Sequence, residues 1–171
     1  MNWKVMGVGM VLSVPLIWAL AQGFSQDPRA LPQALTGQAA PDFSLESLDG
    51  HQISLKDLKG SPAVLNFWAS WCQPCLIEHP GLVSVAKTYK GRGVVFLGIL
   101  YGDNEKDARS FLKRHGTAYP TLVDVNQRSA IDYGIAGVPE TYVLDKDGII
   151  VKKYVGPVSS QELSALLDGL L

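Results

Sequence analysis

Apolar runs of strand length alternate with segments of helical spacing through the middle of the chain. The runs "AVLNFW" (63–68) and "GVVFLGIL" (93–100) are compact and largely apolar, which is typical of strands buried on both faces. A helix is predicted after each run, the first from Pro74 to about Tyr89 and the second within "DNEKDARSFLKRHG". We expect Pro80-Gly81 to kink or weaken the first helix. Strand-helix alternation of this kind predicts parallel strands joined by helical crossovers.

Two hairpin signals flank this parallel core. Asp49-Gly50 divides "FSLESLDGHQISL", and Asp147-Gly148 divides "ETYVLDKDGIIVKKYVG". An Asp-Gly pair between alternating runs is a strong hairpin signal. The final "SSQELSALLDGLL" predicts an amphipathic helix capped by Ser159 or Ser160. The predicted fold class is therefore α/β, a mixed central sheet flanked by helices with an N-terminal β-hairpin extension.

The start of the chain has a different pattern. Lys4 precedes an uncharged apolar run from Val5 to Phe24, long enough to span a bilayer as a helix. The leading positive charge predicts that the start stays in the cytoplasm and the rest is exported. Because "ALA" at 19–21 is also typical of a signal-peptide cleavage site, residues 1–24 are read as a membrane anchor or signal peptide. The length of the run favours the anchor.

Composition divides the remainder and excludes one class of partner. Residues 25–39 are rich in Pro, Ala and Gln and are typical of a linker, which leaves 40–171 as the folded domain. The formal net charge is −1 and no basic run is present, so we expect no nucleic-acid binding.

The two cysteines, Cys72 and Cys75, lie two residues apart in "FWASWCQPC". A disulfide between them closes too small a loop to restrict the unfolded chain much, so a purely structural role is disfavoured. Haem attachment requires a histidine directly after the second cysteine, where Leu76 stands. Zinc would need two further ligands, and the histidines are scattered along the chain (His51, His79 and His115). Thiol-disulfide exchange is the favoured interpretation.

The surrounding sequence assigns a role to each sulfur. The strand 63–68 leads into Cys72, and Pro74 suits a first helical turn, so Cys72 is expected at a helix N-terminus. Backbone N–H groups and the helix dipole stabilise a thiolate there, which makes Cys72 the attacking sulfur. Cys75, one turn later, is expected to face inward and resolve the mixed disulfide. The chain has no flavin or nicotinamide motif, so we expect no cofactor.

At these residues the chain resembles a known family. "FWASWCQPC" resembles the thioredoxin active site, and "GVPET" (137–141), the leading anchor and "ALTGQAAPDFSLESLDG" are similar to the CcmG/DsbE group, related to TlpA and ResA. The resemblance implies a thioredoxin-like fold with Pro139 as a cis-proline opposite the dithiol. It also implies that the Val138 backbone pairs with an extended substrate. Trp71 is interpreted as a rim residue that meets the substrate, and Trp68 as core.

The resemblance also implies a function. Proteins of this group are membrane-tethered thiol reductants of cytochrome c maturation. We therefore expect a single-pass protein of the bacterial inner membrane, with its catalytic domain in the periplasm, that reduces the Cys-x-x-Cys-His segment of apocytochrome c. Its partners would be the cytochrome c maturation machinery and a transmembrane thiol donor of the DsbD/CcdA type. The direction of electron flow rests on the resemblance alone.

Three alternatives stay open. One is an exported reductase of broader specificity, and another is a module that holds apocytochrome without redox chemistry. The third is a peroxidase, prompted by the "APDFSL" segment that is shared with peroxiredoxins.

One departure from thioredoxin concerns proton transfer. Thioredoxin usually has a buried aspartate where this chain has Asn66, and that aspartate helps to deprotonate the resolving thiol. Another group must then exchange the proton, and Glu78 and Glu140 are the candidate catalytic carboxyls, because burial near a thiol raises a carboxyl pKa. Either glutamate could instead be a plain structural or exposed residue. For His79, a capping or surface role is favoured over tuning of the dithiol.

Overall fold

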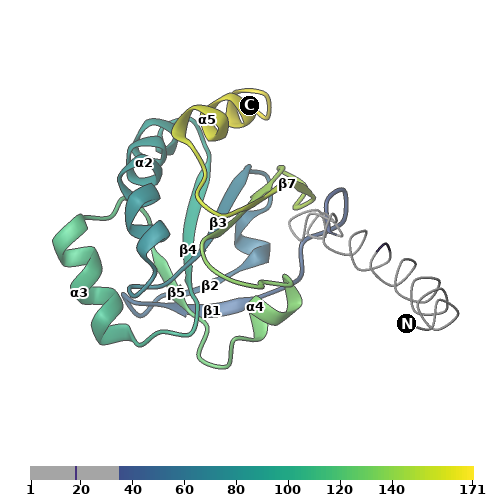
Figure 1. Ribbon diagram of the computed structural model, residues 1–171. Helices are drawn as coiled ribbons and strands as arrows, with labels where there is room; N and C mark the ends of the chain where they lie inside the picture. Colours follow the sequence, from purple (N-terminus) through teal and green to yellow (C-terminus); the bar gives the residue numbers. More distant parts are fainter. Residues whose placement is uncertain (1–17, 19–34) are drawn as a thin grey trace, which may run out of the picture. The chain divides into compact units, whose positions relative to one another are not determined.

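The computed structural model describes Trp18 and residues 35–171. Residues 35–171 fold into a seven-stranded mixed sheet with helices on both faces (Figure 1). The strands are β1 (Ser44–Ser47), β2 (Gln52–Ser54), β3 (Ala63–Trp68), β4 (Val95–Leu100), β5 (Thr121–Val123), β6 (Glu140–Leu144) and β7 (Ile150–Val155). The helices are α2 (Gln73–Lys90), α3 (Glu105–His115), α4 (Arg128–Asp132) and α5 (Ser160–Asp168). The predicted α/β class is confirmed.

The strand order within the described residues is β2-β1-β5-β4-β3-β6-β7. The central strands β3, β4 and β5 are parallel, as the strand-helix alternation predicts. Both hairpins are antiparallel and turn at the predicted Asp-Gly pairs, β1 with β2 and β6 with β7. The N-terminal hairpin joins the sheet through β1, which runs antiparallel to β5.

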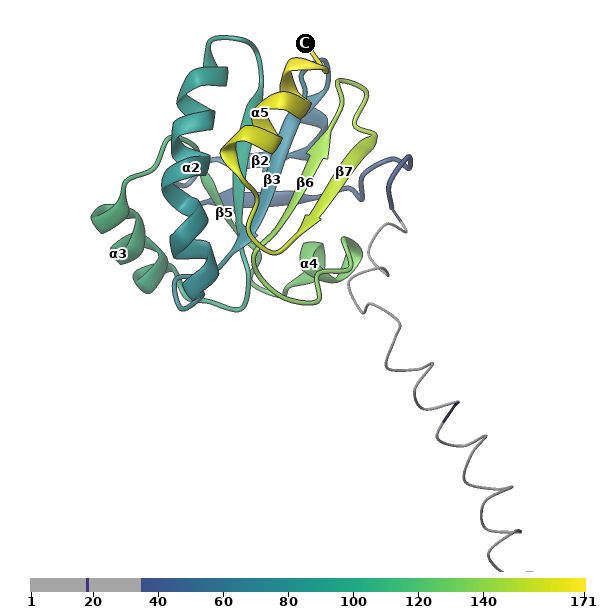
Figure 2. The ribbon, with the colours of Figure 1, turned by 45° about the horizontal axis from the view of Figure 1, so that its top comes forward.

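Helices α2 and α5 pack against the same face of the sheet (Figure 2). Leu82 and Val85 of α2 lie in one buried cluster with Leu163 and Leu167 of α5 and with Val64 of β3. The other face is covered in part by Ala130 of α4 and the following Tyr133, together with residues of the N-terminal hairpin and the turn after it. Strand β3 is therefore buried on both faces, which explains its continuous apolar run.

Helix α2 runs without interruption through Pro80. The residues after Pro80 pack against the sheet and α5, which holds the helix together past the lost hydrogen bond, and the predicted kink or weakening at Pro80-Gly81 stays a prediction. On the inner side of α2, Leu82, Val85 and Ala86 are buried, and Leu76 and Val83 are partly buried against the core.

The folded part begins a few residues before the predicted boundary at residue 40. The N–H of Gly37 donates to the carbonyl of Ile150 at 2.8 Å, and Ala39 bridges to Ile149, so both belong to the edge of the β6–β7 hairpin. Apart from Trp18, the predicted anchor (1–24) lies outside the described residues, as does the linker up to residue 34. No helix among Trp18 and residues 35–171 has the length and apolar character needed to cross a membrane.

Candidate active site

Cys72 is the N-cap residue of α2, directly after the turn that follows β3. Its Sγ accepts a hydrogen bond from the N–H of Cys75 at 3.1 Å, and Pro74 stands in the first helical turn. The two sulfurs are joined by a disulfide, so the structure is that of the oxidised protein. The predicted position of Cys72 is confirmed. After reduction the same N–H and the helix dipole would stabilise a thiolate on Cys72.

The two tryptophans near the dithiol occupy different environments. Trp71 is 61% exposed, and its indole N–H donates to the carbonyl of Gly102 at 3.2 Å. Trp68 is buried, with its ring 5.0 Å from that of Phe111. The core position of Trp68 and the surface position of Trp71 agree with the sequence interpretation. Contact between Trp71 and a substrate stays a prediction.

The segment before β6 lies against the dithiol although it is distant in sequence. Val138 packs against the buried cluster that contains Cys72 and Cys75. The Val138–Pro139 peptide bond is cis, as the resemblance implies. Within residues 35–171, no hydrogen bond involves the backbone N–H or carbonyl of Val138. That backbone is therefore available to an incoming peptide beside the sulfurs.

Glu78 is buried on the same side of α2 as Cys75, one helical turn further along. Asn66 Nδ2 donates to its Oε1 at 2.9 Å, and the N–H of Val158 donates to its Oε2 at 3.0 Å. Burial raises the pKa of Glu78 to about 7, because the hydrogen bonds from Val158 and Asn66 only partly offset the cost of ionisation. The alternative of an exposed helix residue is excluded. Glu78 can gain or lose a proton near neutral pH.

Asn66 also donates to Thr141 Oγ1 at 2.9 Å, so the residue that replaces the aspartate of thioredoxin joins three elements. Its position in the run "AVLNFW" was the one sequence signal for this network, because a polar residue in a strand buried on both faces needs partners. The pattern did not reveal that the partner is Glu78.

Glu140 is buried at the start of β6 in a different environment. Its Oε2 lies 2.7 Å from Nζ of Lys153, and its Oε1 accepts from the N–H of Ala136 at 3.2 Å. The exposed alternative is excluded here as well, and a catalytic role stays a prediction. Lys153 was missed, since one lysine in "VKKYV" gives no sign of being buried.

His79 is buried, so the predicted surface role is wrong. Its Nε2 lies 2.7 Å from the carbonyl of Gly116, the residue that ends α3, and this contact matches the predicted capping role. Burial lowers the pKa of His79, although the contact with Gly116 works in the opposite direction. The ring thus links α2 to the end of α3.

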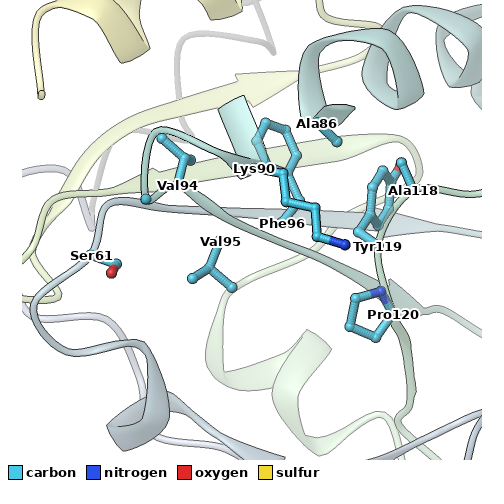
Figure 3. A pocket seen from close by; sticks show the side chains of 10 residues that line it. Ser61, Ala86, Lys90, Val94, Val95, Phe96, Ala118, Tyr119 and Pro120 are labelled. Atoms are coloured by element: carbon cyan, nitrogen blue, oxygen red, sulfur yellow. The ribbon is translucent and has the colours of Figure 1, made fainter. Parts of the chain in front are cut away.

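A hollow of about 330 Å³ lies between the end of α2, the start of β4 and the residues before β5 (Figure 3). Lys90, Phe96 and Tyr119 line it, and its lining contains neither a cysteine nor a carboxylate. It is therefore not the site of the thiol chemistry. Among the described residues, no group of three or more His, Cys, Asp or Glu side chains could hold a metal ion.

Comparison with known proteins gives a consistent result. The sequence pattern of the AhpC/TSA family matches residues 36–153. The thiol-disulfide oxidoreductase ResA of Bacillus thuringiensis is 32% identical over 161 residues, which cover 94% of this chain and 91% of that protein. The thiol:disulfide interchange protein HelX of Rhodobacter capsulatus is 37% identical over 150 residues, covering 85% and 82%. DsbE of Pseudomonas aeruginosa, a thiol:disulfide interchange protein, is 36% identical over 173 residues, covering 97% and 92%.

Solved structures support the same assignment. A crystal structure of a thiol:disulfide interchange protein of the thioredoxin family from Chlorobium tepidum superimposes with a TM-score of 0.70 at 34% identity. The match covers 77% of this chain and 94% of that one. The family match over residues 36–153 and these relatives show that this chain belongs to the AhpC/TSA family of thioredoxin-like proteins, and with its dithiol at the start of α2 it is a thiol-disulfide oxidoreductase of the DsbE, HelX and ResA type.

Proposed function

We propose that this chain is a membrane-anchored reductant, facing the periplasm, that opens the disulfide in the Cys-x-x-Cys-His segment of apocytochrome c. The observation that carries the proposal is the unpaired backbone of Val138, a residue that packs against the buried cluster containing Cys72 and Cys75. An extended peptide that pairs with this backbone would gain main-chain hydrogen bonds and bring its own disulfide to Cys72. The resemblance to the CcmG/DsbE group supports apocytochrome c as the substrate.

The reaction transfers two electrons from the reduced dithiol to the substrate. The Cys72 thiolate attacks one substrate sulfur, the substrate S–S bond breaks, and the other substrate sulfur leaves as a thiolate that takes up a proton. Cys75 then loses its proton and attacks the Cys72 sulfur. This step forms the Cys72–Cys75 disulfide and releases the second substrate sulfur as a thiolate, which is also protonated.

Glu78 is suited to the second step. Cys75 must lose a proton before it attacks, and a group with a pKa of about 7 can accept one near neutral pH. In the reverse direction the same carboxyl would return the proton when the dithiol is recharged. Two electrons must then come from another dithiol, and a transmembrane donor of the DsbD/CcdA type supplies the right chemistry.

The test is the equilibrium reduction potential of the protein, titrated against dithiothreitol and glutathione. A value near or below about −270 mV supports a reductant, whereas a value near about −120 mV would make the protein a disulfide-forming oxidant. In parallel, Cys75→Ala should accumulate a mixed disulfide between Cys72 and an oxidised Cys-x-x-Cys-His peptide. If Cys72→Ser kept full activity in cytochrome c maturation, the protein would act by holding its partner.

Specificity and anchoring need separate measurements. Equal rates on unrelated protein disulfides would favour a reductase of broad specificity, and rapid thiol-dependent consumption of peroxide would favour a peroxidase. For the anchor, the full chain should stay with the inner membrane after alkaline carbonate extraction and keep the mass of the uncut sequence. Release into the periplasm of a chain whose measured mass corresponds to a start after Ala21 would identify a cleaved signal peptide instead.

A further inference from the structure

Lys153, in the middle of β7, is a buried cation without an assigned role. Its side chain is 5% exposed and that of its partner Glu140 is 3% exposed, and 2.7 Å separates Nζ from Oε2. The ammonium also donates to the carbonyl of Gly134 at 3.1 Å and lies 5.1 Å from the centre of the Tyr142 ring. Within residues 35–171, Lys153 is the only partner of Glu140 Oε2. The contact is an ion pair whose geometry does not meet the criteria for a hydrogen bond.

The pair holds the chain segment that precedes the cis-proline at two points. Lys153 binds the carbonyl of Gly134, and Glu140 Oε1 accepts from the N–H of Ala136. Two residues after Ala136 comes Val138, which packs against the dithiol. Since both side chains start from neighbouring strands, they tie this segment to the β6–β7 hairpin.

We propose that Lys153 is a positioning residue, which acts through Glu140 to hold residues 134–138 where their backbone can pair with a peptide substrate. The inference rests on the proposed function, because it concerns reduction of disulfides that lie within a peptide. It also separates the two glutamates. Both oxygens of Glu140 are engaged, one by a cation, so Glu140 orients the segment while Glu78 remains the group that exchanges protons.

Stability alone gives a poor account of this pair. Desolvation of two charges costs about as much as their attraction returns, and buried ion pairs are often replaced by apolar residues without loss of stability. The contacts of the pair with two backbone groups of one loop provide a specific reason for it. The loop ends beside the sulfurs, where a small displacement would misalign the incoming disulfide.

The experiment compares two substrates. One is an oxidised Cys-x-x-Cys-His peptide, blocked at both ends, which can pair with the Val138 backbone. The other is dithiodipyridine, a small disulfide that has no backbone to pair. For Lys153→Met we expect kcat/KM for the peptide to fall about tenfold or more, mainly through KM, with a much smaller loss for dithiodipyridine. Lys153→Arg keeps the charge and should restore most of the peptide activity.

Two further variants keep the test decisive. Lys153→Met leaves a buried carboxylate unpaired and could unfold the protein, so Glu140→Gln/Lys153→Met, which removes both charges, is measured alongside it. The double variant should show the same selective loss and keep the wild-type pH profile with dithiodipyridine. The matched control is Lys152→Met, the neighbouring lysine on β7, which should reduce both substrates at the wild-type rate.

The outcomes distinguish this inference from the proposed function. If the wild-type protein fails to reduce the peptide, the proposed function is wrong. If the wild type reduces the peptide but the variants lose activity on both substrates equally, Lys153 does not position the substrate segment. The same conclusion holds if the variants lose activity on neither substrate. Loss of the pH dependence in the double variant would show that Glu140 exchanges the proton, and would overturn the separation of roles.

Discussion

Replacement of Glu78 by glutamine should change how the stability of the oxidised protein depends on pH. Burial raises the pKa of Glu78 from the ordinary 4.5 to about 7, with Asn66 and the N–H of Val158 opposing the rise. Between these two values the folded protein keeps a proton that the unfolded chain releases. The free energy of unfolding must therefore fall as the pH rises through this window, and level off above it.

The magnitude follows from the two pKa values. A difference of about 2.5 pH units, from 7 minus 4.5, corresponds to about 3 kcal/mol, with a slope of about 1.4 kcal/mol per pH unit inside the window. The stability is fully present below the lower value and is lost as Glu78 ionises. Tyr119 is the other titratable neighbour, and burial together with the charge of Glu78 raises its pKa. It stays protonated throughout this range.

The assay is equilibrium unfolding in urea at a series of pH values on either side of this window, without reductant. The free energy of unfolding of Glu78→Gln is subtracted from that of the wild type at each pH. This difference should show the predicted fall, because the contributions of other groups cancel. Asn66 can turn its amide so that its Oδ1 accepts from the new glutamine and from the hydroxyl of Thr141, which keeps both contacts. Glu46→Gln, at an exposed glutamate of β1, is the control and should leave the curve unchanged. Parallel curves for the wild type and Glu78→Gln would refute the reasoning.

Two further predictions concern packing and capping. A Cβ on Gly98 would lie 2.8 Å from Trp68 Nε1 and 3.0 Å from Thr121 Oγ1, so Gly98→Ala should lower the free energy of unfolding by about 1–3 kcal/mol. Gly91→Ala, where nothing lies within 4 Å, is the control and should show no loss in the same urea titration. The side chain of Asn104 caps α3, and Asn104→Ala should cost about 1 kcal/mol; an unchanged unfolding midpoint would contradict this.

The parts of the fold that local signals determine were predictable from the sequence. Asp-Gly pairs set both hairpins, and Asn104 and Ser159 mark the starts of α3 and α5. The place of β1 beside β5 was not predictable, because strand pairing over such a separation depends on how the whole sheet buries its faces. The helix from Pro74 to about Tyr89 was predicted through Pro80, and α2 spans Gln73–Lys90.

In the candidate site, too, some residues could be predicted from the sequence and others could not. The cysteines and the helix start could be located because their spacing is a property of the local sequence, and Pro139 could be located through the family resemblance. The environments of the glutamates could not be. Glu78 is hydrogen-bonded to Val158, 80 residues away, and no local pattern encodes such a contact.

The contrast between the two glutamates shows why residue type alone could not assign their roles. Both are buried, and each accepts a hydrogen bond from a backbone N–H. The second oxygen of Glu78 meets the neutral amide of Asn66, whereas that of Glu140 meets the ammonium of Lys153. A neutral donor leaves the cost of burying a charge largely uncompensated, so protonation of Glu78 comes within reach of neutral pH. The ammonium of Lys153 and the N–H of Ala136 hold the Glu140 carboxyl in one orientation. The partner of each carboxyl therefore differs: Asn66 on β3 contacts Glu78, and Lys153 on β7 contacts Glu140.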